Sequence, residues 1–143
     1  MLIDFDTPAI ADPYVDLEPL VESGGAMRPW TIDAAAACDG TSYGVRAGHS
    51  GGIDSESYLT MTVPSTWDVT GVSYKYSHPS ALDRGDDFHV LVNGVKKKSY
   101  EIDSAASCKT DTVALNPGDT LQFMCKSGGN GETCSIDQIQ FFK

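Results

Sequence analysis

The chain has 143 residues, a length that suits one domain with its own hydrophobic core, so we expect a single domain over residues 1–143. Its 20 acidic and 10 basic residues give a formal net charge of −10, which repels phosphate backbones and argues against nucleic acid as a partner. No stretch approaches the roughly 20 apolar residues of a membrane-spanning helix, so we expect no membrane insertion.

The first forty residues predict little regular structure. A short edge strand is expected at 2–5, and residues 9–28, which are rich in Pro, Gly and acidic residues, predict a long loop. The run 32–40 is the one helix-friendly segment of the sequence. It is short and ends in Asp39 and Gly40, so a turn is favoured there.

Strand signals then recur along the chain. Polar and apolar residues alternate at 57–63 and at 71–77, where Val72, Tyr74 and Tyr76 share one face. Further strands are expected on both sides of Asn93-Gly94, a typical type I′ hairpin signal, on both sides of the turn at 116–119, and at 135–142. Short strands at this spacing, without crossover helices, predict an all-β, antiparallel two-sheet β-sandwich of the jelly-roll type.

The four cysteines allow three disulfide pairings, and none lies in a C-x-x-C pair, which disfavours a zinc ribbon or a thioredoxin motif. Cys125 ends one expected strand and Cys134 opens the next, with a Gly-rich loop between them. We therefore favour a Cys125–Cys134 bridge that clamps a hairpin loop, which leaves Cys38 to pair with Cys108. Two disulfides predict an oxidising compartment, hence a secreted or cell-surface protein; four reduced thiols in the cytosol are the alternative.

The order of several landmarks resembles a known type of domain. The landmarks are Phe5-Asp6 in the first strand, Pro29-Trp30, the strand YKYS, the hairpin DDFHVLVNG, the strand NPGDTLQF and the closing IDQIQFF. In this order they resemble the MAM-like and carbohydrate-binding-module-like jelly-roll accessory domains of extracellular adhesins, proteases and glycosidases. The resemblance runs from Leu2 to Phe142 without the 9–28 segment, and it implies that Trp30 is buried.

The same resemblance implies a function. Such domains are non-catalytic binding or adhesion modules, so we expect a module of a larger extracellular chain that binds a glycan. A protein-binding adhesion or structural domain is the alternative. The start of the sequence lacks the basic and apolar blocks of a signal peptide, which agrees with a segment of a longer secreted protein.

Many such domains hold a structural calcium ion where the first and last strands meet. Asp6 stands where the family has an acidic residue after the first-strand Phe, and Asp137 stands at the Ile-Asp of the closing strand. Asp4 shares a strand face with Asp6 because strand side chains alternate with period two. Carboxylates are preferred calcium ligands, so we predict structural calcium bound by Asp4, Asp6 and Asp137; solvated carboxylates are the alternative.

A sugar is usually held by an aromatic ring that stacks on its apolar side and by polar groups that orient its hydroxyls. Trp67 is predicted to be in a turn after Pro64, where core packing explains a large aromatic residue less easily than in a strand. We therefore select Trp67 as the ring that stacks on the sugar; partial burial is the alternative. Tyr74 and Tyr76 are the hydroxyl donors that we select for a concave sheet face. The other tyrosines considered for that role are Tyr43, Tyr58 and Tyr100.

Catalytic signals are weak. His49, His78 and His89 are scattered and form no H-E-x-x-H motif, and the disulfides leave no cysteine nucleophile. Asp54 and Glu56 are expected on one strand face, where two neighbouring carboxylates need no catalytic explanation. We therefore predict that the chain is not an enzyme; a small hydrolase is the alternative.

Overall fold

The structure, a computed structural model, describes residues 2–3, 15–16, 30–38, 43–47, 55–78, 87–100, 106–127 and 134–143. Its elements are β1 (Leu2–Ile3), β2 (Val15–Asp16), β3 (Thr31–Asp33), the 3-10 helix η1 (Ala34–Ala36), β4 (Gly44–Arg46), β5 (Ser55–Thr62), β6 (Gly71–His78), β7 (Asp87–Val92), β8 (Val95–Tyr100), β9 (Ala106–Ala114), β10 (Thr120–Ser127) and β11 (Ser135–Phe142). Among these residues, no helix has the length and apolar character of a membrane span.

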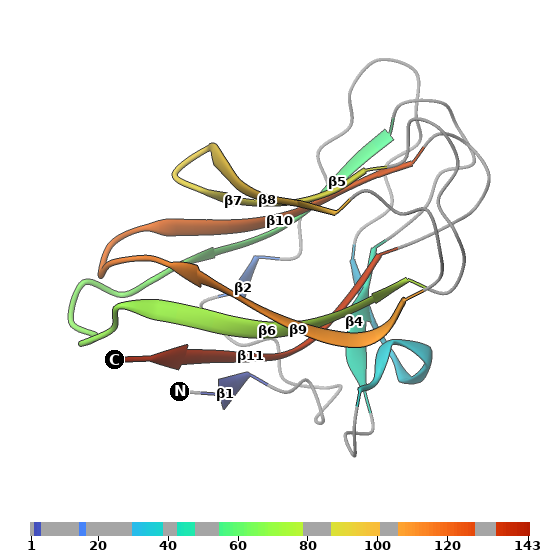
Figure 1. The fold of residues 1–143 in the computed structure, drawn as a ribbon, viewed down its shortest axis with the longest axis horizontal. Helices are drawn as coiled ribbons and strands as arrows, with labels where there is room; N and C mark the ends of the chain where they lie inside the picture. Colours follow the sequence, from blue (N-terminus) through green and yellow to red (C-terminus); the bar gives the residue numbers. More distant parts are fainter. Residues whose placement is uncertain are drawn as a thin grey trace.

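The strands form two antiparallel sheets that pack face to face, the upper and lower layers of Figure 1. The five-stranded sheet has the order β2-β5-β10-β7-β8. The six-stranded sheet has the order β3-β4-β11-β6-β9, and β1 also pairs with β11. The predicted antiparallel β-sandwich is confirmed.

The core lies between the sheets because each strand turns every second side chain inward. Tyr74 meets the face of Phe123 edge-on across the sandwich, with ring centroids 5.0 Å apart. Trp30 is 1% exposed, as the resemblance implied. Each fully buried large apolar side chain contributes roughly 1.5–3 kcal/mol. The largest others are Phe88, Leu59, Leu115, Leu121, Ile136, Ile139, Val45, Val63 and Val72.

The tight turns lie where the sequence predicted them. Asn93 and Gly94 have φ values of 52° and 76°, as a type I′ hairpin requires, and they join β7 to β8. The Asn93 side chain donates to the Asp119 carboxylate at 2.7 Å, and the Asn116 backbone N–H donates to the same carboxylate at 2.7 Å. These hydrogen bonds, the Asn116 one first, lower the pKa of Asp119 and tie the two turns together.

Both favoured disulfides are confirmed, Cys38–Cys108 and Cys125–Cys134. The prediction that the second one clamps a hairpin loop is wrong. Cys125 is in β10, which pairs with β5 and β7, whereas Cys134 directly precedes β11 in the other sheet. The short bridge therefore links the two sheets.

Two further features differ from expectation. The 9–28 segment contains β2, which pairs with β5, so it is not loop throughout. The helix-friendly run 32–40 contains the end of β3 and then η1, whereas Asp39 and Gly40, where a turn is favoured, lie outside the described residues. The strand β4 was not predicted, because three residues are too few for an alternation pattern to stand out.

Candidate functional site

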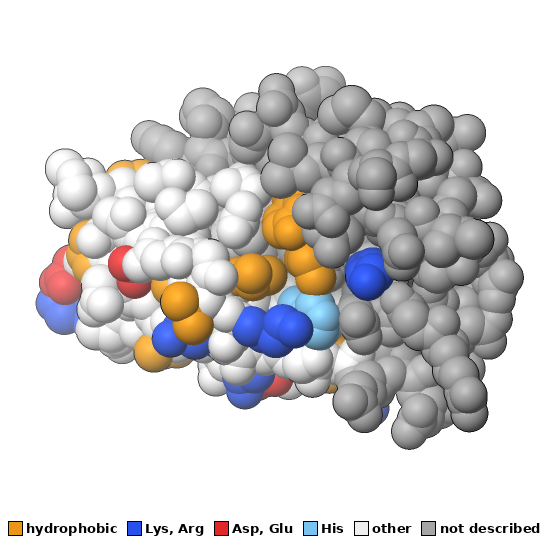
Figure 2. All heavy atoms as spheres, turned by 90° about the horizontal axis from the view of Figure 1, so that it is seen from above, with side chains coloured by type: hydrophobic (Ala, Val, Ile, Leu, Met, Phe, Trp, Pro, Cys, Tyr) orange, Lys and Arg blue, Asp and Glu red, His pale blue; other side chains and the backbone are white. Residues whose placement is uncertain are grey.

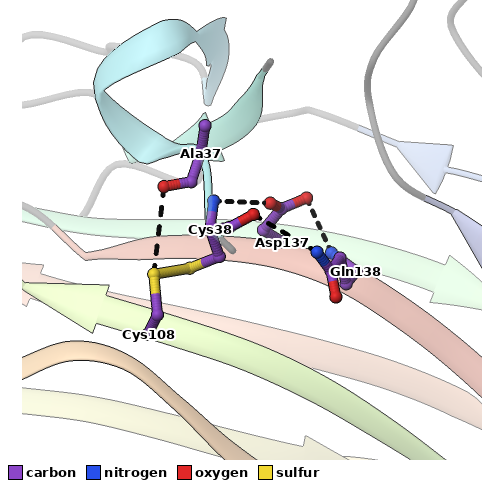
Figure 3. Close-up of a disulfide and its surroundings, with 5 residues drawn as sticks. All are labelled: Ala37, Cys38, Cys108, Asp137 and Gln138. Atoms are coloured by element: carbon purple, nitrogen blue, oxygen red, sulfur yellow. Dashed lines mark hydrogen bonds between the residues drawn. A yellow bond between two sulfur atoms is a disulfide. The ribbon is translucent and has the colours of Figure 1, made fainter. Parts of the chain in front are cut away.

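The outer face of the six-stranded sheet is partly covered by the chain itself. Residues 34–38, which we call the strap, run over this face, and Figure 3 shows how they are attached. The backbone N–H of Cys38 donates to Asp137 Oδ2 in β11 at 2.8 Å, and the Cys38 side chain is disulfide-bonded to Cys108 in β9. Because β6 lies between β11 and β9, the strap crosses β6 and is bonded on both sides of it.

Asp137 is the buried acid of this region, with 0% of its surface exposed. Its register partner is Lys75, on the side of β6 that faces away from the core. Asp137 Oδ1 accepts the backbone N–H of Gln138 at 2.7 Å, and Gln138 has a φ of 47° at the irregularity between β11 and β6. A buried carboxylate is stable only with such hydrogen bonds, so Asp137 fixes the strap to the sheet.

The described residues alone do not make a calcium site. Both Asp137 oxygens already accept backbone N–H groups, and no three His, Cys, Asp or Glu side chains cluster as metal ligands in the described parts of the chain. The predicted ligands Asp4 and Asp6 lie outside the described residues. The pairing of Ile3 with Ile139 nevertheless brings the first strand to within two residues of Asp137.

The outer face of the five-stranded sheet has a different composition. The strand register sets its outward residues in rows that run across the strands. One row contains Tyr58 of β5, Met124 of β10, His89 of β7 and Ser99 of β8. The next row contains Thr60, Gln122, Leu91 and Lys96. Figure 2 looks onto this face and shows histidine, lysine and hydrophobic side chains gathered on its described part.

These two rows, which we call the open face because the strap lies on the other sheet, combine apolar and hydrogen-bonding groups. Tyr58 is half-buried, and Met124 and His89 are 8% and 5% exposed. The amide of Gln122 donates to the Thr60 hydroxyl at 3.3 Å, which orients the amide. An aromatic ring beside oriented polar groups is the composition of a ligand-binding surface.

A polar cluster joins the two sheets along one side of the sandwich, and we call it the clasp. Lys98 of β8 donates to Asp111 Oδ1 of β9 at 2.9 Å, and the Tyr100 hydroxyl donates to Asp111 Oδ2 at 2.8 Å. Because Tyr100 gives its proton to Asp111, Tyr74 is the donor in the 2.5 Å hydrogen bond between the two tyrosine hydroxyls. The clasp thus runs from the buried Tyr74 to the surface.

The clasp changes the ionisation of its members. Burial raises the pKa of Tyr74 and of Tyr100, and the nearby Asp111 charge raises both further. Burial acts to raise the pKa of Asp111 as well, but hydrogen bonds from Lys98, the Thr112 backbone N–H and Tyr100 outweigh it and lower that pKa. At neutral pH the cluster therefore holds an ionised carboxylate and two neutral tyrosines.

The predicted ligand-binding tyrosines are wrong for a surface site. Tyr74 and Tyr76 are 0% and 8% exposed and face the core, where Tyr76 stacks on Tyr100 with centroids 4.2 Å apart. The physical reason is their alternation with Ser73 and Lys75, because the apolar side of a half-buried strand turns inward. The same rule applied to β5, where Leu59 and Met61 face the core, would have placed Tyr58 on the outer face.

Trp67 lies between β5 and β6, as predicted, and is half-buried. Its ring packs edge-on against Phe141 with centroids 5.3 Å apart, and its backbone N–H donates to the Pro64 carbonyl. This packing explains why Trp67 is half-buried at the edge of the core. The structure does not bring it together with the residues of the open face.

Comparison with solved structures supports the fold. The K1 cleaved adhesin domain of Lys-gingipain from Porphyromonas gingivalis W83 superposes with a TM-score of 0.73 at 11% identity, over 99% of this chain and 96% of that one. The K2 cleaved adhesin domain of Lys-gingipain gives 0.64 at 15% identity, over 100% and 99%. TmCBM27, a carbohydrate-binding module with specific mannan recognition, gives 0.54 at 9% identity, over 99% and 94%.

No protein-family model matches the sequence, and no curated protein matches it either. At these identities the structural likeness shows the shared β-sandwich, which is the fold of adhesin and carbohydrate-binding domains. The MAM-like part of the sequence resemblance stays a prediction. Ligand and partner have to be argued from this chain's own side chains.

Proposed function

We propose that the chain is a non-catalytic, extracellular carbohydrate-binding module whose binding surface is the open face. The observation that carries the proposal is the composition of this face. The strand register sets Tyr58 in the row next to Gln122 and Thr60, and the Gln122 amide is oriented by its hydrogen bond to the Thr60 hydroxyl. Fold neighbours that are adhesin domains and a mannan-recognising module support the same class of function, and two disulfides support an extracellular location.

The chemistry of the open face suits a short oligosaccharide. The Tyr58 ring offers an apolar surface for the C–H side of a pyranose, and Gln122 and Thr60 offer hydrogen bonds to hydroxyls. Strands lie roughly 4.8 Å apart, so a row of four residues spans about 14 Å. A glycan lying across the strands would contact both rows at once.

Calcium is proposed as a stabilising ion at the junction of β1 and β11. Support comes from the β1–β11 pairing next to Asp137 and from the oxygen ligands that Asp4 and Asp6 would supply. An ion bound to the native state alone raises its melting temperature. A melt in calcium that equals the melt in chelator would remove the ion from the proposal.

The function is tested on an array of neutral and acidic glycans with wild type, Tyr58→Ala and a matched pair of threonine variants. Thr60→Ala changes the open face, whereas Thr112→Ala changes an exposed threonine of β9 in the other sheet. We expect Tyr58→Ala to lower affinity about tenfold, Thr60→Ala to lower it less, and Thr112→Ala to leave it unchanged. If no glycan is retained, or if Tyr58→Ala binds like wild type, the proposal fails; recovery of a protein partner instead would favour an adhesion domain.

A further inference from the structure

Basic residues are concentrated on one pair of strands in an otherwise acidic chain. β8 carries Lys96, Lys97 and Lys98, and β9 carries Lys109 and Asp111, so the two strands hold four basic residues and one acidic residue. The rest of the chain then has 6 basic and 19 acidic residues, a formal charge of −13 against +3 on these two strands.

The two strands lie side by side although they belong to different sheets. β8 is an edge of the five-stranded sheet and β9 is an edge of the six-stranded sheet, and the clasp bonds Lys98 and Tyr100 of one to Asp111 of the other. The lysines of both strands therefore lie along the same side of the sandwich; we call this set the lysine edge and define it as Lys96, Lys97, Lys98 and Lys109.

Three of these lysines are available for a ligand. Lys98 is already paired with Asp111, whereas Lys96, Lys97 and Lys109 are exposed and form no ion pair within the part of the chain that the structure describes. Lys97 has a longer-range effect, since its charge helps to lower the pKa of Asp119. An exposed ammonium group without a fixed partner can bind an external anion without first breaking an internal contact.

The lysine edge is also continuous with the open face. Lys96 ends the row that contains Gln122 and Leu91, and Ser99 ends the row that contains Tyr58 and His89. A glycan lying across the strands therefore meets Lys96 at the β8 end. We propose, resting on the proposed function above, that the ligand is an anionic glycan whose carboxylate or sulfate groups pair with Lys96, Lys97 and Lys109.

The charge distribution supports this class of ligand. A protein with a net charge of −10 repels a polyanion over most of its surface, so a local positive edge selects both the binding site and the orientation of the ligand. A neutral glycan would gain no charge pairing from these lysines.

The test compares polygalacturonate, which carries carboxylates, chondroitin sulfate, which also carries sulfates, neutral mannan and polyglutamate as a non-glycan polyanion. The variants are the triple change Lys96→Gln, Lys97→Gln, Lys109→Gln and the single change Lys97→Gln, with Lys143→Gln as the matched control on another part of the surface. We expect the triple variant to bind the acidic glycans about tenfold more weakly and with less salt dependence. The single variant should lose less, and the control should bind like wild type.

Other results of this experiment would overturn the inference, the proposed function or both. If the triple variant binds the acidic glycans like wild type, or if polyglutamate binds as tightly as they do, the inference is overturned. If wild type binds mannan in preference and the triple variant keeps that binding, the inference fails while the proposed function stands. If no glycan of either kind binds, the proposed function fails as well, and the lysines serve to protect a sheet edge from pairing.

Discussion

The two outer faces of the sandwich use their side chains for different ends. The outer face of the six-stranded sheet is partly covered by the strap. The Cys38–Cys108 disulfide and the buried Asp137 carboxylate hold the strap in place and so stabilise the fold. On the five-stranded sheet, Tyr58 and Gln122 are directed outward, and the strap lies on the other sheet. The same strand geometry thus gives one outer face that is crossed by the strap, which we call the closed face, and the open face, where aromatic and polar side chains alternate with those that point into the core.

The largest effect is expected from removal of a disulfide, and it should differ between the two bridges. Replacing Cys38 and Cys108 by Ser should lower the free energy of unfolding by about 4 kcal/mol, because the bridge closes a long loop, and replacing Cys125 and Cys134 should cost about 3 kcal/mol. The sequence separations are 70 and 9 residues. Urea denaturation of both double variants measures the difference. A larger loss for the short bridge would contradict the expectation that the bridge closing the longer loop stabilises the fold more.

Substitution of Asp137 tests how the strap is held on the closed face while both disulfides stay intact. Asp137→Ala leaves the backbone N–H groups of Cys38 and Gln138 without their acceptor and should destabilise the protein by about 3 kcal/mol. Asp137→Asn keeps one acceptor oxygen and serves as the control with a smaller loss. Glycan binding per folded molecule should stay unchanged in both. Equal stability of wild type and the Ala variant would remove Asp137 from this role.

Asp111 tests the clasp between the faces. Asp111→Asn removes the charge that Lys98 and Tyr100 contact and should cost about 1 kcal/mol at pH 7, since the pair is partly exposed. The folded-state pKa of Asp111 lies below its ordinary 3.8, so its ionisation stabilises the fold above pH 3.8 and this contribution is lost as the pH falls through the folded value. The difference in free energy of unfolding between wild type and Asp111→Asn should therefore be smaller in acid than at pH 7. Urea denaturation at pH 7 and at a pH below the folded-state pKa of Asp111 measures this difference. A gap that does not change with pH would contradict the account.

The smallest effect is expected at the surface ion pair of Lys143 with Asp68. Both side chains are more than two-thirds exposed, at 73% and 74%. Lys143→Gln should change the free energy of unfolding by less than about 0.5 kcal/mol, as measured by thermal and urea unfolding. A loss as large as that of Asp111→Asn would contradict the expectation that the more exposed pair, Lys143 with Asp68, stabilises the fold less than Lys98 with Asp111.

The sequence predicted the fold well where alternation was long. β5 and β6 carry clear period-two patterns, Asn93-Gly94 marks the β7–β8 hairpin, and the residues beside Cys125 and Cys134 left one favoured disulfide pairing. It failed where the information is not local. Nothing in the short segment between Cys125 and Cys134 indicates that the strands on either side enter different sheets, because sheet membership depends on partners far along the chain.

The candidate site was predicted less well than the fold. Choosing Tyr74 and Tyr76 ignored the polar residues between them, which mark the opposite side of β6 as outward. The open face contains His89, Met124 and Gln122, three residues without any common motif in the sequence. They meet only through the register of β10 with β7 and β5, which the sequence does not show.

The most direct test of the account is a map of backbone amide shifts in the NMR spectrum during titration with oligosaccharides of mannose and of galacturonate. We predict that the oligosaccharide that binds shifts the amides of Tyr58, Gln122 and Leu91 and leaves those of Ser73 and Thr112, on the closed side, unchanged. Shifts confined to the closed side, or to the turn around Trp67, would contradict the assignment of the open face as the binding surface.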